Sequence, residues 1–252
     1  MGRASSRKRE RREGRTGLKQ SSKGNSLTPA SQLQPAERGG FKGEVIYRFF
    51  DDPSHADDLA AGKVWISTLE ACRRYENQKR GDPEEAVHRY NSGFATGNGD
   101  DPEFVEIARR SMVLLGPDVT NGVLSNNTVE DVLIDAFVLC TTENADPTDL
   151  EEKFGPYCVK ISNSERFFDL VTKRLHQCRE DVLENLMGKV HYRDRNWMGL
   201  EDPPGIPGFV KPVHLYQVEQ EVRFLWTVRN PSHIRPFLLE VPEAAHLCIR
   251  VR

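Results

Sequence analysis

The stretch EVRFLW, residues 221–226, constrains the fold more than any other part of the chain. Its alternation predicts a β-strand with the aromatic side chains together on one face. Glu221 and Arg223 lie on the opposite face, and the same alternation would place Glu219 beside them. A sheet with one strongly apolar face and one charged face is either solvated on the charged side or forms the wall of a polar cleft.

The charge of the chain is unevenly distributed along the sequence. Residues 1–25 contain nine Lys or Arg and two Glu, whereas the whole chain has a formal net charge of −3, so the remainder is acidic. Residues 1–40 are rich in Arg, Lys, Ser, Gly, Gln and Pro, which predicts a disordered basic tail before a single domain over residues 41–252. Residues 3–23 are candidates for weak nucleic-acid contact, the alternative being a tail that only solubilises the protein.

The apolar runs and the cysteines indicate a cytoplasmic protein. No run approaches the roughly 20 apolar residues of a membrane-spanning helix, and no apolar segment follows the basic N-terminus as in a signal peptide. The five cysteines are odd in number and include no CxxC pair, so we expect reduced thiols rather than a disulfide framework.

The remaining patterns mix helices and strands without regular βαβ alternation, which predicts an α+β fold. Strands are expected at residues 44–50, 64–67, 136–141, 157–161, 189–192, 221–226, 236–241 and 247–251. Helices are expected over residues 55–62, 103–115 and 165–187, and a further helix is expected to begin near Thr68. Ser54 is the expected N-cap of the first, and Asn163 or Ser164 that of the helix over 165–187. Residues 76–102 are predicted to be a long loop.

Two positions on the first strands are candidates for ligand binding. Arg48 lies between apolar neighbours, where a guanidinium must either pair with a carboxylate or bind an anion such as phosphate. Ser67 and Thr68 end the next strand and either orient a ligand or cap the following helix.

Glu219 and Glu221 are the candidate catalytic residues. Alternation along a strand separates them by roughly 6–7 Å. One carboxylate would stabilise a ribosyl cation and the other would deprotonate a nucleophile. The alternative is an exposed strand face with Arg223 in a cross-strand pair. His191, Asp194 and His214 lack metal-ligand spacing, so no metal site is predicted.

Taken together, these residues resemble an uncharacterised bacterial domain family. The resemblance covers about residues 45–228 and rests on three motifs in order, YRF at 47–49, LAAGKVWIS at 59–67 and EQEVR at 219–223. More distantly, the chain resembles ADP-ribosyltransferases, although Leu69 occupies the third place of that family's Ser-Thr-Ser motif.

The distant resemblance implies an ADP-ribosyltransferase-like fold, with a mixed or antiparallel sheet split around a cleft and flanking helices. It implies that Tyr47, Arg48, Ser67 and Thr68 bind NAD, that Glu221 is catalytic and that Glu219 activates an acceptor. The implied function is NAD-dependent ADP-ribosyl transfer, or NAD hydrolysis, on an unknown macromolecule by a toxin, effector or stress or defence enzyme.

Two other functions fit the same residues. One is a non-enzymatic module that binds a nucleotide or protein partner, with a basic tail that holds nucleic acid. The other is a structural or regulatory protein in which Arg48 and Glu221 form a buried ion pair.

Overall fold

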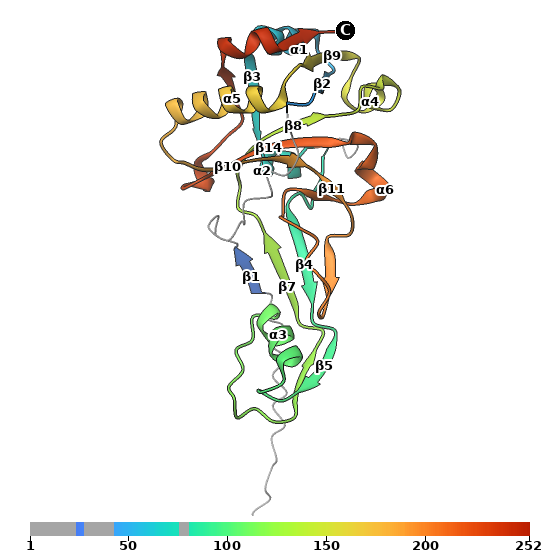
Figure 1. The fold of residues 1–252 in the computed structure, drawn as a ribbon, viewed down its shortest axis with the longest axis vertical. Helices are drawn as coiled ribbons and strands as arrows, with labels where there is room; N and C mark the ends of the chain where they lie inside the picture. The colour runs from blue at the N-terminus through green and yellow to red at the C-terminus, as the bar shows by residue number, and fades with distance from the viewer. Residues whose placement is uncertain (1–23, 28–42, 76–80) are drawn as a thin grey trace, which may run out of the picture.

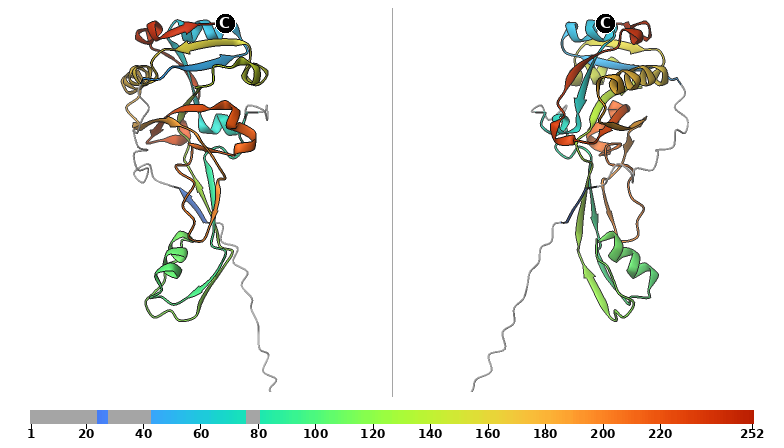
Figure 2. Two further views of the ribbon diagram at one scale, coloured as in Figure 1. Left: turned by 45° about the vertical axis from the view of Figure 1, so that its right-hand side comes forward. Right: turned by 90° about the vertical axis from the view of Figure 1, so that its left-hand side faces the viewer.

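The computed structural model describes residues 24–27, 43–75 and 81–252, and it divides into a broad body and a narrow arm (Figure 1). We call the arm the part formed by residues 87–132 together with β12 (Asn196–Met198); α3 and β5 lie at its far end (Figures 1 and 2). The C-terminus lies at the opposite end of the molecule, in the body. Most of the predicted basic tail lies outside the described residues, which include only β1 (Gly24–Leu27) from residues 1–40.

An eight-stranded sheet organises the body. Its longest path is β10-β14-β8-β2-β9-β16, and β3 and β15 branch from β8. The strands are β2 (Ile46–Phe50), β3 (Lys63–Thr68), β8 (Phe137–Thr142), β9 (Tyr157–Ile161), β10 (Val182–Lys189), β14 (Glu221–Val228), β15 (Phe237–Glu240) and β16 (Cys248–Arg250). All pairings in this sheet are antiparallel, which confirms the predicted α+β class with antiparallel sheets.

The sheet forks at β8. One edge of β8 pairs with β14, and the other edge is shared by two strands that meet it at opposite ends. Tyr47 of β2 lies opposite Thr142, whereas Ser67 of β3 lies opposite Val138. One branch continues as β2-β9-β16 and the other as β3-β15, and we call the region where β2 and β3 diverge the fork.

The larger core lies on the aromatic face of β14, as its alternation predicted. Helix α5 (Ser164–Cys178) covers this face, with Phe168 stacked on Trp226 at 5.6 Å between ring centroids. The indole Nε1 of Trp226 donates to Thr172 Oγ1 at 2.8 Å, so the buried ring keeps its hydrogen bond.

The other helices of the body are α1 (Pro53–Ala60), α2 (Leu69–Arg73), α4 (Pro147–Phe154) and α6 (Val213–Tyr216), with the 3-10 helices η2 (Gln217–Glu219), η3 (Pro231–His233) and η4 (Pro242–Leu247).

The arm is a long antiparallel pair of strands with a small tip. β4 (Val87–Asn91) pairs with β7 (Thr128–Val132), and β12 and β1 extend this sheet on its two sides. The tip consists of the pair β5 (Phe94–Gly97) and β6 (Gly122–Ser125) with α3 (Pro102–Arg110) packed on it. Phe104, Ala108 and Leu124 form the centre of the tip core. A last short pair, β11 (His191–Tyr192) with β13 (Val210–Lys211), lies at the base of the body.

The predicted loop over residues 76–102 is wrong beyond residue 80. Residues 76–80 lie outside the described part, but β4 and β5 occupy much of the remainder. His88 and Tyr90 are buried while their neighbours in β4 are half-exposed, so the alternation of a strand is present. The Gly, Asp and Asn residues that flank it favoured a loop and obscured this signal.

The predicted helix 165–187 is also too long. It starts as expected, with Asn163 accepting a hydrogen bond from Arg166 N at 2.8 Å, but α5 ends at Cys178 and β10 follows. The spacing of four between Val182 and Leu186 fits a strand as well as a helix, and pairing with β14 decides for the strand. At α1 the cap is Asp52 rather than Ser54. No helix in the described ranges is long and apolar enough to span a membrane.

Candidate functional site

The charged face of β14 is buried. All eight residues of the strand are buried, so the face with Glu221 and Arg223 is neither solvated nor open to a ligand. The predicted exposed strand face is therefore wrong. Residues from the base of the arm and from the segment 206–211 cover it, with Ala86 and Phe209 packed against Leu225.

Arg223 sits at the centre of a buried ion-pair network. Its guanidinium is 1% exposed and binds two carboxylates, with Nε 2.7 Å from Glu221 Oε1 and Nη1 2.7 Å from Glu85 Oε1. Both contacts are bidentate, because Nη2 lies 3.1 Å from Glu221 Oε2 and 3.2 Å from Glu85 Oε2. The Nη1 group also donates to the carbonyl of Gly208. This planar arrangement uses the hydrogen-bonding capacity that makes arginine suited to buried pairs.

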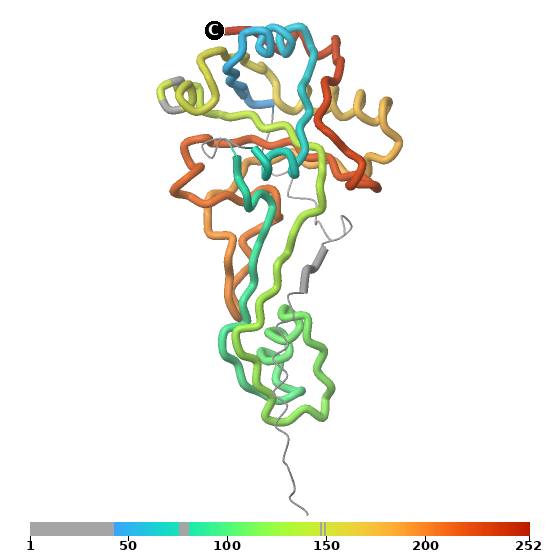
Figure 3. Tube along the Cα trace, turned by 180° about the vertical axis from the view of Figure 1, so that it is seen from behind, coloured from blue at the N-terminus to red at the C-terminus, as the bar shows by residue number. Residues whose placement is uncertain are grey.

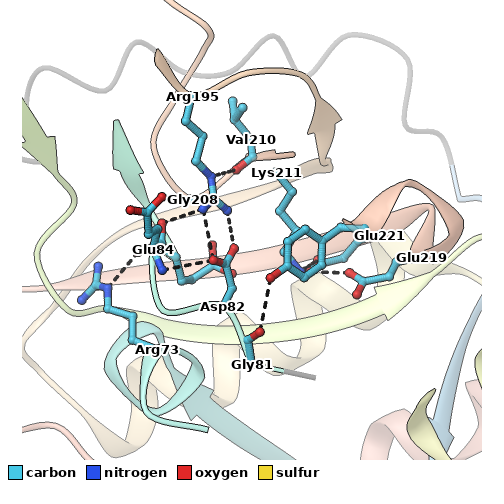
Figure 4. A network of polar contacts seen from close by, with 12 residues as sticks. Arg73, Gly81, Asp82, Glu84, Arg195, Gly208, Val210, Lys211, Glu219 and Glu221 are labelled. Atoms are coloured by element: carbon cyan, nitrogen blue, oxygen red, sulfur yellow. Dashed lines mark hydrogen bonds and ion pairs between the residues drawn. The ribbon is translucent and has the colours of Figure 1, made fainter. Parts of the chain in front are cut away.

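Lys211 joins Glu221 to Glu219. Its Nζ lies 2.7 Å from Glu221 Oε2 and 2.9 Å from Glu219 Oε2 (Figure 4). The other oxygen of Glu219 accepts a hydrogen bond from Lys153 at 2.5 Å. Glu219 does not belong to the strand, as alternation had suggested. It ends the 3-10 helix η2, and Gln220, with a φ of 40°, breaks the alternation before β14 begins.

A second buried pair lies beside the first. Arg195 forms an ion pair with Asp82, and Nη1 of Arg195 donates to Asp82 Oδ1 at 3.1 Å (Figure 4). Its remaining donors bind the carbonyls of Val210 and Glu84. Asp82 and Glu85 belong to one short segment, so the two pairs together attach the base of the arm to the body.

These contacts determine the protonation state of Glu221. Burial alone would raise its pKa, but the charges of Arg223 and Lys211 outweigh burial and hold the pKa well below the usual range. The carboxylate is therefore ionised throughout the physiological pH range and is a poor general base, which would need a pKa near the working pH. Glu221 and Glu219 are brought together as predicted, but as partners of buried cations.

Arg48 differs from these cations because it lies at the fork without a carboxylate. It is half-buried, and its Nη1 donates to the carbonyl of Trp65 on β3 at 3.2 Å, across the divergence of the two strands. Within the described ranges no carboxylate forms an ion pair with Arg48, so the predicted structural pair, including the one with Glu221, is absent there. Desolvation of the guanidinium lowers the pKa of Arg48 to about 10.

The other predicted ligand residues lie on both sides of the fork. Tyr47 and Ser67 are half-buried and share the face of the sheet that carries Val138, since the residues opposite one another in a sheet point the same way. Thr68 is buried, and its Oγ1 accepts a hydrogen bond from Ala71 N at 3.1 Å. The cap interpretation is confirmed for Thr68, whose hydroxyl is used inside the protein.

Sequence reasoning missed the partners that reach Glu221 and Arg223 from other segments. Glu85 lies in the region predicted as a loop, and Lys211 follows a proline- and glycine-rich stretch, so neither showed strand alternation or motif spacing. The one available signal was that Lys211 follows the apolar pair Phe209-Val210, which indicates burial of the neighbouring chain.

No family model matches the sequence, and no curated protein or solved structure shows significant similarity to it. The resemblance to the bacterial domain family and to ADP-ribosyltransferases therefore remains a prediction. No group of three or more His, Cys, Asp or Glu side chains that could hold a metal ion occurs in the described part of the chain.

Proposed function

We propose that this chain is a binding module that takes a nucleotide-class anion at the fork, with Arg48 as the residue that binds phosphate. The observation that carries the proposal is the half-buried guanidinium of Arg48, for which the described residues provide a carbonyl partner but no carboxylate. A desolvated cation without a counter-charge is costly, and a phosphate or carboxylate group would satisfy both its charge and its remaining donors.

Aromatic side chains at the fork suit the base or ribose of such a ligand. Trp65, whose backbone carbonyl binds Arg48, is 49% exposed, although it is a large apolar residue in a strand of the main sheet. The ring of Phe50, on the same face of β2 as Arg48, lies 5.4 Å from the guanidinium carbon and is half-buried. Arg48 supplies the charge that a nucleotide needs, and the exposed indole of Trp65 on the neighbouring strand is a candidate surface for stacking of its base.

The test is to titrate the protein with NAD, ADP and inorganic pyrophosphate. Binding is measured by calorimetry and by the change in tryptophan fluorescence. We expect saturable binding, weakened at least about tenfold by Arg48→Gln, since the loss of one charge-assisted contact is worth about 1.5–3 kcal/mol. Arg166→Gln, at an exposed position on α5, is the matched control and should bind as wild type does. Absence of saturable binding to all three probes, or equal binding by Arg48→Gln, would overturn the proposal.

Catalysis by Glu221 is a separate hypothesis that the same protein can test. ADP-ribosyl transfer or NAD hydrolysis would need this carboxylate at the nicotinamide ribose, but both of its oxygens are engaged by Arg223 and Lys211. We therefore favour the non-enzymatic module and expect no nicotinamide release from NAD. If wild type releases nicotinamide and a folded Glu221→Gln variant does not, the protein is a transferase or glycohydrolase and the binding-module proposal is wrong.

Protein recognition by the arm is a second candidate function, favoured by the apolar surface of its tip. Leu114 and Phe94 are 97% and 74% exposed, and Met112 and Val123 are also exposed. Exposed apolar side chains gathered at one end of a protein commonly mark a protein interface. A partner captured by wild type and lost by the double variant Phe94→Ser/Leu114→Ser, but retained by Arg48→Gln, would support this function.

A further inference from the structure

Two of the five cysteines pack on the same apolar cluster although they come from different elements. Cys72 belongs to α2 and Cys140 to β8, and both pack on the apolar cluster that contains Val138 and Leu225. Each thiol influences the ionisation of the other, and neither forms a disulfide.

The chain connects the two elements tightly at this point. The first residue of α2, Leu69, donates its backbone N–H to the carbonyl of Ala136 at 3.0 Å, directly before β8. The Glu70 N–H binds Asp135 Oδ1 at 2.8 Å, so the first turn of α2 is fixed to the start of β8. Cys72 lies three residues after Leu69 and therefore on the same face of the helix, toward the cluster that holds Cys140.

The surroundings of the two thiols differ from those of the buried cysteines. Interaction with Cys140 lowers the pKa of Cys72 and outweighs burial and the charge of Glu85, which raise it, whereas the pKa of Cys140 is raised by the same interaction and by burial. Both side chains are partly exposed. A thiol with a lowered pKa next to one that can resolve an adduct is the usual arrangement of a reversible redox site.

We propose that Cys72 and Cys140 form a reversible intramolecular disulfide when the protein meets a low-molecular-weight disulfide such as oxidised glutathione. The Cys72 thiolate attacks one sulfur of the oxidant, forms a mixed disulfide and releases one glutathione thiolate. Cys140 then transfers its proton to that thiolate and attacks the sulfur of Cys72, which releases the second glutathione. The two cysteines lose two electrons in total, and these reduce the oxidant to two glutathione molecules.

This inference goes beyond the proposed binding function and does not depend on it. The disulfide would link α2 covalently to the central strand of the body sheet, close to Arg48, whose charge interacts with both thiols. Oxidation would therefore be expected to change ligand binding at the fork, but the existence of the bond can be established without any ligand.

The experiment treats the full chain with oxidised glutathione, blocks free thiols with a maleimide and maps peptides without reduction. We expect a linked peptide pair containing Cys72 and Cys140, formed faster in the native protein than in urea, and its loss on treatment with reduced glutathione. A native protein that yields no such pair, or that carries glutathione only on the exposed Cys178, would overturn the proposal.

Variants test the order of the two steps. Cys140→Ser should accumulate the mixed disulfide at Cys72, and Cys72→Ser should leave Cys140 without glutathione. Cys178→Ser is the matched control and should form the Cys72–Cys140 bond at the wild-type rate. Equal glutathione incorporation at position 140 in Cys72→Ser would contradict the assignment of Cys72 as the attacking residue.

Discussion

Arg223 and Glu85 form a fully buried bidentate ion pair across 138 positions of the sequence, with Nη1 2.7 Å from Oε1. Arg223 lies on β14 in the middle of the body sheet, whereas Glu85 immediately precedes the arm. Figure 3 shows from behind how the two strands of the arm continue into the body. The pair therefore connects the segment from which the arm extends to the body sheet, beside the apolar cluster that contains Ala86 and Leu225.

Removal of one member of this pair should destabilise the protein strongly. Glu85→Ala leaves the guanidinium of Arg223 with Glu221 alone, and breaking a buried pair costs about 3–5 kcal/mol. Glu106→Ala removes two surface pairs on α3, with Arg109 and with Arg110, and each should cost less than about 1 kcal/mol. Urea unfolding of both variants measures the difference, and similar losses would show that the buried pair contributes no more than the surface pairs.

Acidification should remove the contribution of Glu221 to the stability of the folded protein. Its folded-state pKa is depressed below the ordinary value of 4.5, so its stabilisation is fully present above about pH 4.5 and is lost as the pH falls through the folded value. Glu221→Gln should therefore be less stable than wild type at pH 7, and the gap should narrow below pH 4.5. Unfolding curves at pH 7, 4 and 3 measure this difference. Glu103→Gln, at an exposed position, is the control, and its stability should stay close to that of wild type at each pH.

His88 should make stability depend on pH in a higher window. Desolvation, with a contribution from the charge of Arg195, lowers its pKa from 6.5 to about 4. The unfolded chain binds a proton at this site below pH 6.5 and the folded chain does not, so stability should fall as the pH drops from 6.5 to 4. Between pH 7 and 5 the loss should be about 2 kcal/mol at most. A thermal-unfolding series in which His88→Gln shows the same slope as wild type would contradict the assignment.

The tip of the arm should tolerate changes on its surface but not in its core. Phe104 is buried, and Cβ atoms placed on Gly97 and Gly122 would lie 2.5 and 2.7 Å from its atoms, so Phe104 packs directly against both strands of the tip. Phe104→Ala should cost about 3–5 kcal/mol of local stability. Leu114→Ser should change stability by less than about 0.5 kcal/mol, because Leu114 has almost no contacts to lose.

Hydrogen exchange of backbone amides shows whether the stability changes of Phe104→Ala and Leu114→Ser are confined to the arm or extend to the body. Faster exchange over residues 94–125 in Phe104→Ala, with unchanged protection of β8 and β14, is the expected pattern. Loss of protection in the body as well would show that tip and body unfold as one unit.

The strands with clear alternation or continuous apolar runs could be predicted from the sequence. β8, β9 and β14 lie where they were expected, and the aromatic face of β14 is the face that packs against α5. The Asn163 cap of α5 and the role of Thr68 as the cap of α2 could also be predicted, because both depend on local hydrogen bonds. These features depend on residues close in sequence, so their physical cause is visible in a short window.

Local pattern failed where distant pairing decided the structure. Residues 182–186 carry a spacing that suits a helix or a strand, and only the neighbouring β14 selects the strand. The half-exposed β4 looked like a loop, because its alternation is carried by His88 and Tyr90 rather than by aliphatic residues.

Strand alternation is enough to place Glu221 and Arg223 on one face and to show that Arg48 needs an anionic partner. The partners of these three residues depend on how distant parts of the chain pack together. Glu85 lies 138 positions before Arg223 and neutralises it, and Lys211 belongs to another short strand and neutralises Glu221, whereas no carboxylate within the described ranges reaches Arg48. The physical reason is that the energy of a buried charge depends on what surrounds it in space, and residue types along a strand do not contain that information.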